Sequence, residues 1–148
     1  MRLKIWTATT AMLLCALPSL SQARDDTLYL PFEKVVAQMT AAKKLDGSVK
    51  FYLAGVQPRG KVNVITPGAV TNKKTNAFNK SDEEACAWAL QSALLTLQDS
   101  ARKVNANAVT NISSYYKRNE RKDAVTYECH AGAVMAGVAL KGDLSRVD

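Results

Sequence analysis

Apolar residues recur every three or four positions over residues 82–104, and this spacing predicts a long amphipathic α-helix. Ser81 stands before the segment with Glu84 three residues later, which is the pattern of a capping box. Acidic residues in the first turn and basic residues in the last turn complement the helix dipole, and Asn105 is placed to cap its end. The face expected to be buried carries Cys86, Leu90, Ala93, Leu94, Leu97, Ala101 and Val104.

A shorter helix and several strands are expected on either side of the long helix. Pro31 opens a helical pattern over residues 32–44. Alternation of apolar and polar residues predicts strands at residues 27–30, 49–53, 61–66, 107–116 and 124–131. The last two strands have the pattern of a hairpin with one solvent-exposed face, and its apolar face carries Val125, Tyr127 and Cys129.

Three further segments are less regular. Pro67-Gly68 marks a turn or bulge, and the polar residues 69–80 are typical of an exposed loop or a frayed strand. Residues 131–140 are small and apolar, which favours a buried segment, but periodicity leaves both strand and helix open. Residues 141–148 are expected to form a polar tail.

Together these elements predict the α+β fold class, with a small mixed or antiparallel sheet packed by the long helix 82–104 and the shorter helix 32–44. Cys86 lies on the apolar face of the long helix, and Cys129 shares the apolar face of the hairpin with Tyr127. Both faces belong to one interface, so we predict a helix-to-sheet disulfide that closes a loop of about 44 residues. Two unpaired buried thiols are the alternative.

The first 23 residues have the order of a secretory signal peptide. Two basic residues precede the uncharged segment 5–17, which is shorter than the roughly 20 residues that span a bilayer. Small residues at Ser21 and Ala23 predict cleavage after Ala23, and Cys15 leaves with the peptide. We therefore expect a soluble protein in the periplasm or secreted from the cell, with residues 24–148 as a single domain. A core helix at the N-terminus is the alternative.

The chain is basic, with a formal net charge of +7 over 148 residues. Removal of the first 23 residues leaves 125 residues with 18 basic and 13 acidic side chains, a net charge of +5. This charge is compatible with binding to nucleic acid, glycans or anionic lipid, and equally with a merely soluble surface. Cations and aromatic rings are concentrated at the expected hairpin tip, so the candidate anion-binding residues are Tyr115, Tyr116, Lys117, Arg118, Arg121 and Lys122. A solvated hairpin end is the alternative.

Little in the sequence points to catalysis. Residues 55–62 approach the phosphate-binding P-loop pattern, yet Val62 replaces the required Ser or Thr and a strand pattern follows where a helix should begin. We expect a turn between strands there. His130 is a weak candidate metal ligand, because it is the only histidine and a site needs three or four ligands. A solvent-facing strand histidine is the alternative, and we expect no cofactor and no enzymatic activity.

Several motifs resemble a family of small exported bacterial proteins labelled "excinuclease ATPase subunit". They are residues 76–86, Asn107-Ala108-Val109, Tyr115-Tyr116 and residues 128–134, and they extend over most of the mature chain. The ATPase activity in that label would need the complete P-loop that residues 55–62 lack. More distantly, the order of helix, Asn-Ala-Val strand and Cys-containing strand is similar to the RcsF envelope-stress sensor lipoproteins and the YbjQ-like α+β domains. This resemblance implies a helix on a small sheet with a disulfide, and an interaction role in the envelope.

The sequence therefore predicts a non-enzymatic binding or interaction protein of the bacterial cell envelope. Its expected partner is another envelope protein or a surface component, with no nucleic-acid partner and no transmembrane segment in the mature chain. Polyanion binding through the basic hairpin tip is the second hypothesis. Metal handling through His130 is the third.

Overall fold

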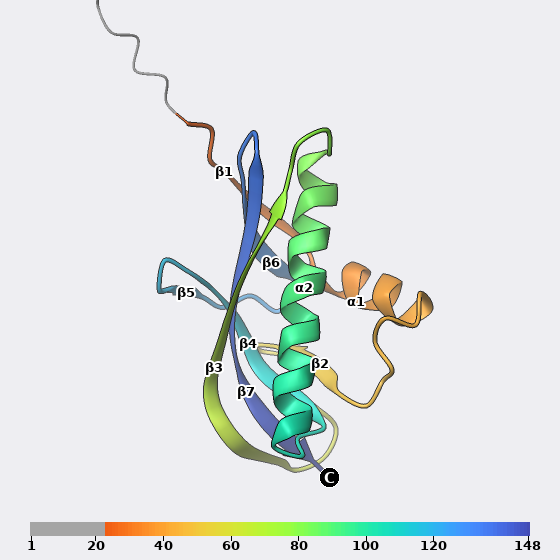
Figure 1. Cartoon of the computed structure of the whole chain (residues 1–148). Helices are drawn as coiled ribbons and strands as arrows, with labels where there is room; N and C mark the ends of the chain where they lie inside the picture. The colour runs from red at the N-terminus through yellow and green to blue at the C-terminus, as the bar shows by residue number, and fades with distance from the viewer. Residues whose placement is uncertain (1–22) are drawn as a thin grey trace, which may run out of the picture.

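The computed structural model describes residues 23–148, so the expected signal peptide, residues 1–23, lies outside the described residues except for Ala23. Within residues 23–148, seven strands form one mixed sheet and two helices pack beside it, which confirms the α+β fold class (Figure 1). The elements in chain order are β1 (Asp26–Pro31), α1 (Phe32–Ala41), β2 (Lys50–Leu53), β3 (Val62–Asn76), α2 (Asp82–Lys103), β4 (Ala108–Tyr116), β5 (Asn119–Arg121), β6 (Thr126–Ala131) and β7 (Met135–Val147).

The strand that organises the sheet is β7. It pairs along its length with β3, and its other edge pairs first with β6 and then with β4. The outer strands are β3, which pairs only with β7, together with β1, antiparallel to β6, and β2, parallel to β4, while the short β5 folds back on β4. Three ladders thus meet on one strand, and helix α2 packs against β7 and β3 (Figure 1).

Helix α2 begins and ends within one residue of its predicted bounds because its termini carry strong local signals. The Ser81 hydroxyl accepts a hydrogen bond from the backbone N–H of Glu84 at 3.1 Å, as an N-cap should. At the other end Val104 is the C-cap, and Asn105 follows it with φ of 58°, in the left-handed conformation that Asn tolerates. The predicted apolar face is buried except for the half-exposed Val104.

Helix α1 is shorter than the predicted 32–44. It ends at Ala41 because Lys43 takes a left-handed conformation, with φ of 57°, and turns the chain. The backbone N–H groups of Lys44 and Leu45 then bond back to the carbonyl of Met39. This turn directs Leu45 into the core, where it is 4% exposed.

Two polar segments, one expected to be an exposed loop or a frayed strand and the other a tail, belong to the sheet. Residues 69–76 continue β3 past the predicted bulge, where the register to β7 shifts between Thr66 and Ala69. Residues 141–147, expected as a polar tail, are the second half of β7, and residues 135–140 form its first half as a strand. Their polar side chains alternate with buried ones such as Leu144, so a polar composition here reflects one face of a strand.

The predicted hairpin of residues 107–131 is also corrected. Strand β4 forms its hairpin with β5 through the turn at residues 117–118, whereas β6 pairs with β1 and β7. Tyr127 and Cys129 are buried as predicted, but Val125 lies ahead of β6 and is 65% exposed. The opposite face of β6 is half-buried, because Thr126, Glu128 and His130 are all of intermediate exposure.

Asp123 fixes the start of β6, and a test of its role follows from the pKa of its carboxyl group. Hydrogen bonds from the backbone N–H groups of Thr126 and Val125 lower this pKa below its ordinary value. The carboxylate therefore stabilises the fold above the unfolded pKa of about 4, and this stabilisation is lost as the pH falls through the lower, folded pKa.

We expect Asp123→Asn to unfold at lower urea concentration at neutral pH and to lose less stability than the wild type on acidification below about pH 4. Urea midpoints measured across that range are the readout. Asp99→Asn, on the exposed side of α2, is the charge-matched control. Equal pH profiles for the Asp123→Asn variant and the wild type would contradict the assigned role.

Candidate functional site

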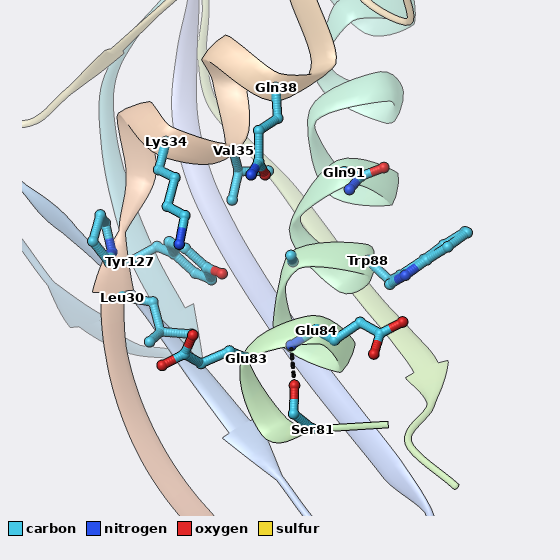
Figure 2. Close-up of a pocket in the computed structure, with 12 residues that line it drawn as sticks. Leu30, Lys34, Val35, Gln38, Ser81, Glu83, Glu84, Trp88, Gln91 and Tyr127 are labelled. Carbon is cyan, nitrogen blue, oxygen red and sulfur yellow. Dashed lines mark hydrogen bonds between the residues drawn. The ribbon is translucent and has the colours of Figure 1, made fainter. Parts of the chain in front are cut away.

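A groove of about 510 Å³ lies between α1 and the first half of α2 (Figure 2). One wall is α1, the other is α2, and Tyr127 of β6 lies between them. The volume is within the range of small-ligand sites. The lining combines apolar and polar side chains: Leu30, Pro31, Lys34, Val35, Gln38, Ser81, Glu83, Glu84, Ala87, Trp88, Gln91 and Tyr127.

Local structure holds both walls in place. Helix α1 follows β1 without a loop, and the N–H of Phe32 donates to the carbonyl of Val125 at 3.1 Å. Its inner face is anchored by Phe32, Val35 and Met39, all of which are buried in the core. The wall of the groove that α1 forms is therefore a helix anchored in the core.

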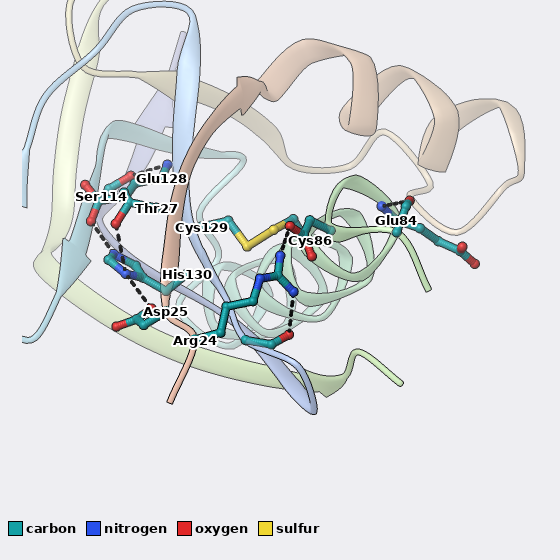
Figure 3. Close-up of a disulfide and its surroundings, with 12 residues drawn as sticks. Arg24, Asp25, Thr27, Glu84, Cys86, Ser114, Glu128, Cys129 and His130 are labelled. Carbon is teal, nitrogen blue, oxygen red and sulfur yellow. Dashed lines mark hydrogen bonds and ion pairs between the residues drawn. A yellow bond between two sulfur atoms is a disulfide. The ribbon is translucent and has the colours of Figure 1, made fainter. Parts of the chain in front are cut away.

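The disulfide joins the second wall to the sheet. Cys86 of α2 and Cys129 of β6 are bonded, with their Cα atoms 5.8 Å apart, which confirms the predicted pair (Figure 3). Arg24 adds a polar tie beside it, because its guanidinium pairs with Asp26 at 2.6 Å and also with Asp82 at the start of α2. The N-terminal half of α2, which lines the groove, is thus attached to β6 by the disulfide and to Arg24 by an ion pair.

Tyr127 places a phenol inside the groove. Burial raises the pKa of this phenol, and the negative charge of Glu83 raises it further, so the hydroxyl is neutral and can donate a hydrogen bond. No hydrogen bond joins it to the other residues that line the groove (Figure 2). A ligand that enters would find this donor unused.

Trp88 marks the rim of the groove. It is 48% exposed, although it belongs to a helix whose inner face is fully buried. The Lys44 ammonium lies 5.4 Å from the centroid of the indole ring and also donates to the amide oxygen of Gln91 at 3.0 Å. Lys44 thus contacts two side chains of α2, and much of the indole ring remains open to a ligand.

The six residues of the predicted basic tip do not form one surface. Tyr115, Lys117 and Arg118 lie together around a hollow on the sheet, whereas Lys122 lines a different hollow. Arg121 lies over the ring of Tyr29, with the guanidinium carbon 4.1 Å from the centroid, and pairs with Asp123. Tyr116 stacks on His130, with ring centroids 3.3 Å apart.

His130 is not the solvent-facing residue that the alternative interpretation expected, because its side chain is only 13% exposed. Nε2 is 2.6 Å from Oε1 of Glu128, and Nδ1 is 3.4 Å from both Thr27 and Asp25 (Figure 3). Within residues 23–148, no three His, Cys, Asp or Glu side chains come together as a metal site would require.

The P-loop-like segment forms the expected connection between strands. Residues 54–61 join β2 to β3, and Val62 begins a strand where a P-loop would begin a helix. Among the helices that the structure describes, none is both long enough and apolar enough to cross a membrane.

Sequence reasoning missed the groove, because its walls are two helices, Phe32–Ala41 and Asp82–Lys103, that are far apart in the sequence. One signal was present in Trp88, which lies outside the apolar stripe of α2 and had no assigned partner. Comparison of the chain with protein-family models, with curated proteins and with solved structures found no match.

Proposed function

We propose that this protein is a non-enzymatic binding protein of the bacterial cell envelope, and that the groove between α1 and α2 is its ligand site. The observation that carries the proposal is the combination of a 510 Å³ groove with an unused phenol donor at Tyr127 and an exposed indole at Trp88. Sites for small ligands and for peptide side chains are commonly apolar hollows with a few directed polar groups.

The assignment to the envelope rests on the disulfide and on the predicted signal peptide. Both cysteines are fully buried, and a pair of this kind persists in oxidising compartments such as the periplasm. The first 23 residues have the charge and hydrophobicity order of an export signal. These two features are independent, since one is a bond within the fold and the other precedes the described residues.

The choice of binding over catalysis rests on the chemistry of the lining. Its one aliphatic hydroxyl, at Ser81, already serves as the N-cap of α2 by accepting the N–H of Glu84. No lining residue is a histidine or cysteine that could serve as base or nucleophile. The polar groups that remain are suited to hold a ligand by hydrogen bonds and charge.

The test is photo-crosslinking in intact cells. A photoreactive residue at Gln38 or Gln91, on opposite walls, is expected to capture the same species, while one at Asn63 on β3 should capture none. Mass spectrometry of the adduct identifies the species and also shows whether residues 1–23 have been removed.

A blocking variant controls for accidental proximity. Ala87→Trp fills the groove from a half-buried position on α2, whereas Ala87→Ser leaves it open. We expect the adduct to be lost with tryptophan and retained with serine, in proteins that unfold at similar temperatures. Equal adducts in both variants, or equal capture from Asn63, would overturn the proposal.

A further inference from the structure

A second hollow, of about 450 Å³, lies on the sheet at the β4–β5 turn and is separate from the groove. Ala139 of β7 lines this hollow, whereas its neighbours Val138 and Leu140 face the core. Successive side chains of a strand point to opposite faces, so the hollow is on the opposite face of the sheet from α2. The lining residues are Val70, Asn72, Tyr115, Lys117, Arg118 and Ala139. They include two cations, an amide and a phenol, and no carboxylate.

The two cations occupy a turn that is normally built from other residues. Lys117 and Arg118 join β4 to β5 and have φ of 50° and 65°, so both are left-handed. A two-residue hairpin turn with positive φ at both positions favours Asn-Gly, because larger side chains are strained there. Two adjacent positive charges therefore occupy a turn in which their backbone is strained. Backbone strain of this kind is concentrated at functional sites.

Neither cation is neutralised within the part of the chain that the structure describes. The ion pairs of residues 23–148 engage Arg24, Arg102, Arg121, Lys141 and Arg146, together with His130, but neither Lys117 nor Arg118. The Lys117 ammonium lies 5.2 Å from the centroid of the Tyr116 ring, which is itself stacked on His130. One cation is thus positioned by an aromatic ring while its charge stays free for a ligand.

We propose that this hollow binds a sugar unit that carries a phosphate or sulfate group. Lys117 and Arg118 hold the anionic group, and Asn72 hydrogen-bonds the ring hydroxyls. Val70 contacts the apolar face of the ring. Val70 is 54% exposed, so this apolar contact is open to a ligand.

The geometry favours a charged sugar over a membrane or a nucleic acid. Recognition of an anionic lipid surface typically uses clusters of about four to eight basic residues, and this hollow has two. Single-stranded nucleic acid binds on successive exposed aromatic rings. Here Tyr115 is half-buried beneath the Lys141 ammonium, 5.2 Å from its centroid, and Tyr116 is covered by His130.

The decisive variant is Lys117→Asn combined with Arg118→Gly, which installs the favoured turn sequence and removes both charges. We expect it to be at least as heat-stable as the wild type and to bind a sulfated heparin hexasaccharide about ten-fold more weakly or worse, by calorimetry in about 50 mM salt. Wild-type binding should weaken at about 200 mM salt, and the variant should show a smaller salt dependence.

Matched controls distinguish binding at this hollow from an effect of net charge and from binding in the groove. Arg59→Asn with Lys61→Asn removes two exposed charges from the β2–β3 connection, and we expect less than about a two-fold change in affinity. Ala87→Trp, which fills the groove, should bind the hexasaccharide as the wild type does. Asn72→Ala should weaken binding of the hexasaccharide more than binding of inorganic phosphate.

Three results would overturn the inference. The first is no measurable hexasaccharide binding by the wild-type protein. The second is an equal loss of affinity in the Arg59/Lys61 variant and the Lys117/Arg118 variant, which would show that net charge alone matters. The third is equal or tighter binding to anionic phosphatidylglycerol vesicles or to single-stranded DNA, which would assign the surface to another class of partner.

Discussion

Joint replacement of Cys86 and Cys129 by alanine is expected to lower the free energy of unfolding by about 4 kcal/mol. The bond links residues 43 positions apart, and closure of a loop of this length restricts the unfolded chain by about that amount on the chain-entropy model. Both sulfur atoms lie in the core, since each cysteine is 0% exposed, so the variant also loses packing. The loss is a large fraction of the total stability of a typical domain, which is roughly 5–15 kcal/mol.

Urea unfolding with and without reductant measures this effect. The wild type should lose stability when reduced, whereas the double alanine variant should unfold at the same urea concentration in both conditions. A fall of less than about 1 kcal/mol on reduction would contradict the prediction. Because the bond holds α2 against β6, reduction should also weaken any ligand binding in the groove.

Leu94→Ala is expected to cost about 2–5 kcal/mol, the usual price of a cavity in a closely packed core. Leu94 is 0% exposed on the face of α2 that packs against the sheet. The adjacent Leu95 points away and is 37% exposed. Leu95→Ala removes the same atoms from the same helix and should cost less than about 1 kcal/mol.

The pair of leucine variants is informative because helix propensity changes equally in both. The difference between their unfolding free energies therefore measures burial alone. Thermal and urea unfolding of the two variants side by side gives this difference. Equal destabilisation would mean that α2 does not pack against the sheet through the assigned face.

Features with a strong local cause were predictable from the sequence. The bounds of α2 followed from Ser81, Glu84 and an apolar stripe of six turns, and these signals act within the helix itself. The disulfide followed because Cys86 and Cys129 each lay on an apolar face, and the two faces had to meet. The bulge at Pro67-Gly68 was likewise a property of the local residues.

Features that depend on distant pairing were not predictable. Residues 141–147 are as polar as a tail, but β3 and β4 pair with both of their edges and enclose Leu144 and Ser145. The expected hairpin was wrong for a similar reason: β4 pairs with the nearby residues 119–121, and β6 pairs with β1 and β7. Alternation shows that a segment is a strand, but not which strand lies beside it.

The candidate site also has a part that was predictable from the sequence and a part that was not. The residues of the basic tip were visible in the sequence, but their separation into different surfaces was not. Tyr116 contacts His130 and Arg121 contacts Tyr29, and both contacts are tertiary. The hollow that remains gains Val70 and Asn72 from β3, a segment expected to be a loop or frayed strand. The groove needed α1 and α2 to be placed side by side, which no local pattern specifies.

The position of β7 constrains when the chain can fold. A polypeptide leaves the ribosome amino end first, so β7 emerges after the six other strands that the structure describes, although it pairs along both of its edges within the sheet. Until Met135–Val147 has emerged, β3, β4 and β6 lack their shared neighbour, and α2 lacks one of the strands that it packs against. The sheet is therefore completed only after the six strands before β7 have emerged, so the order of the strands delays its closure.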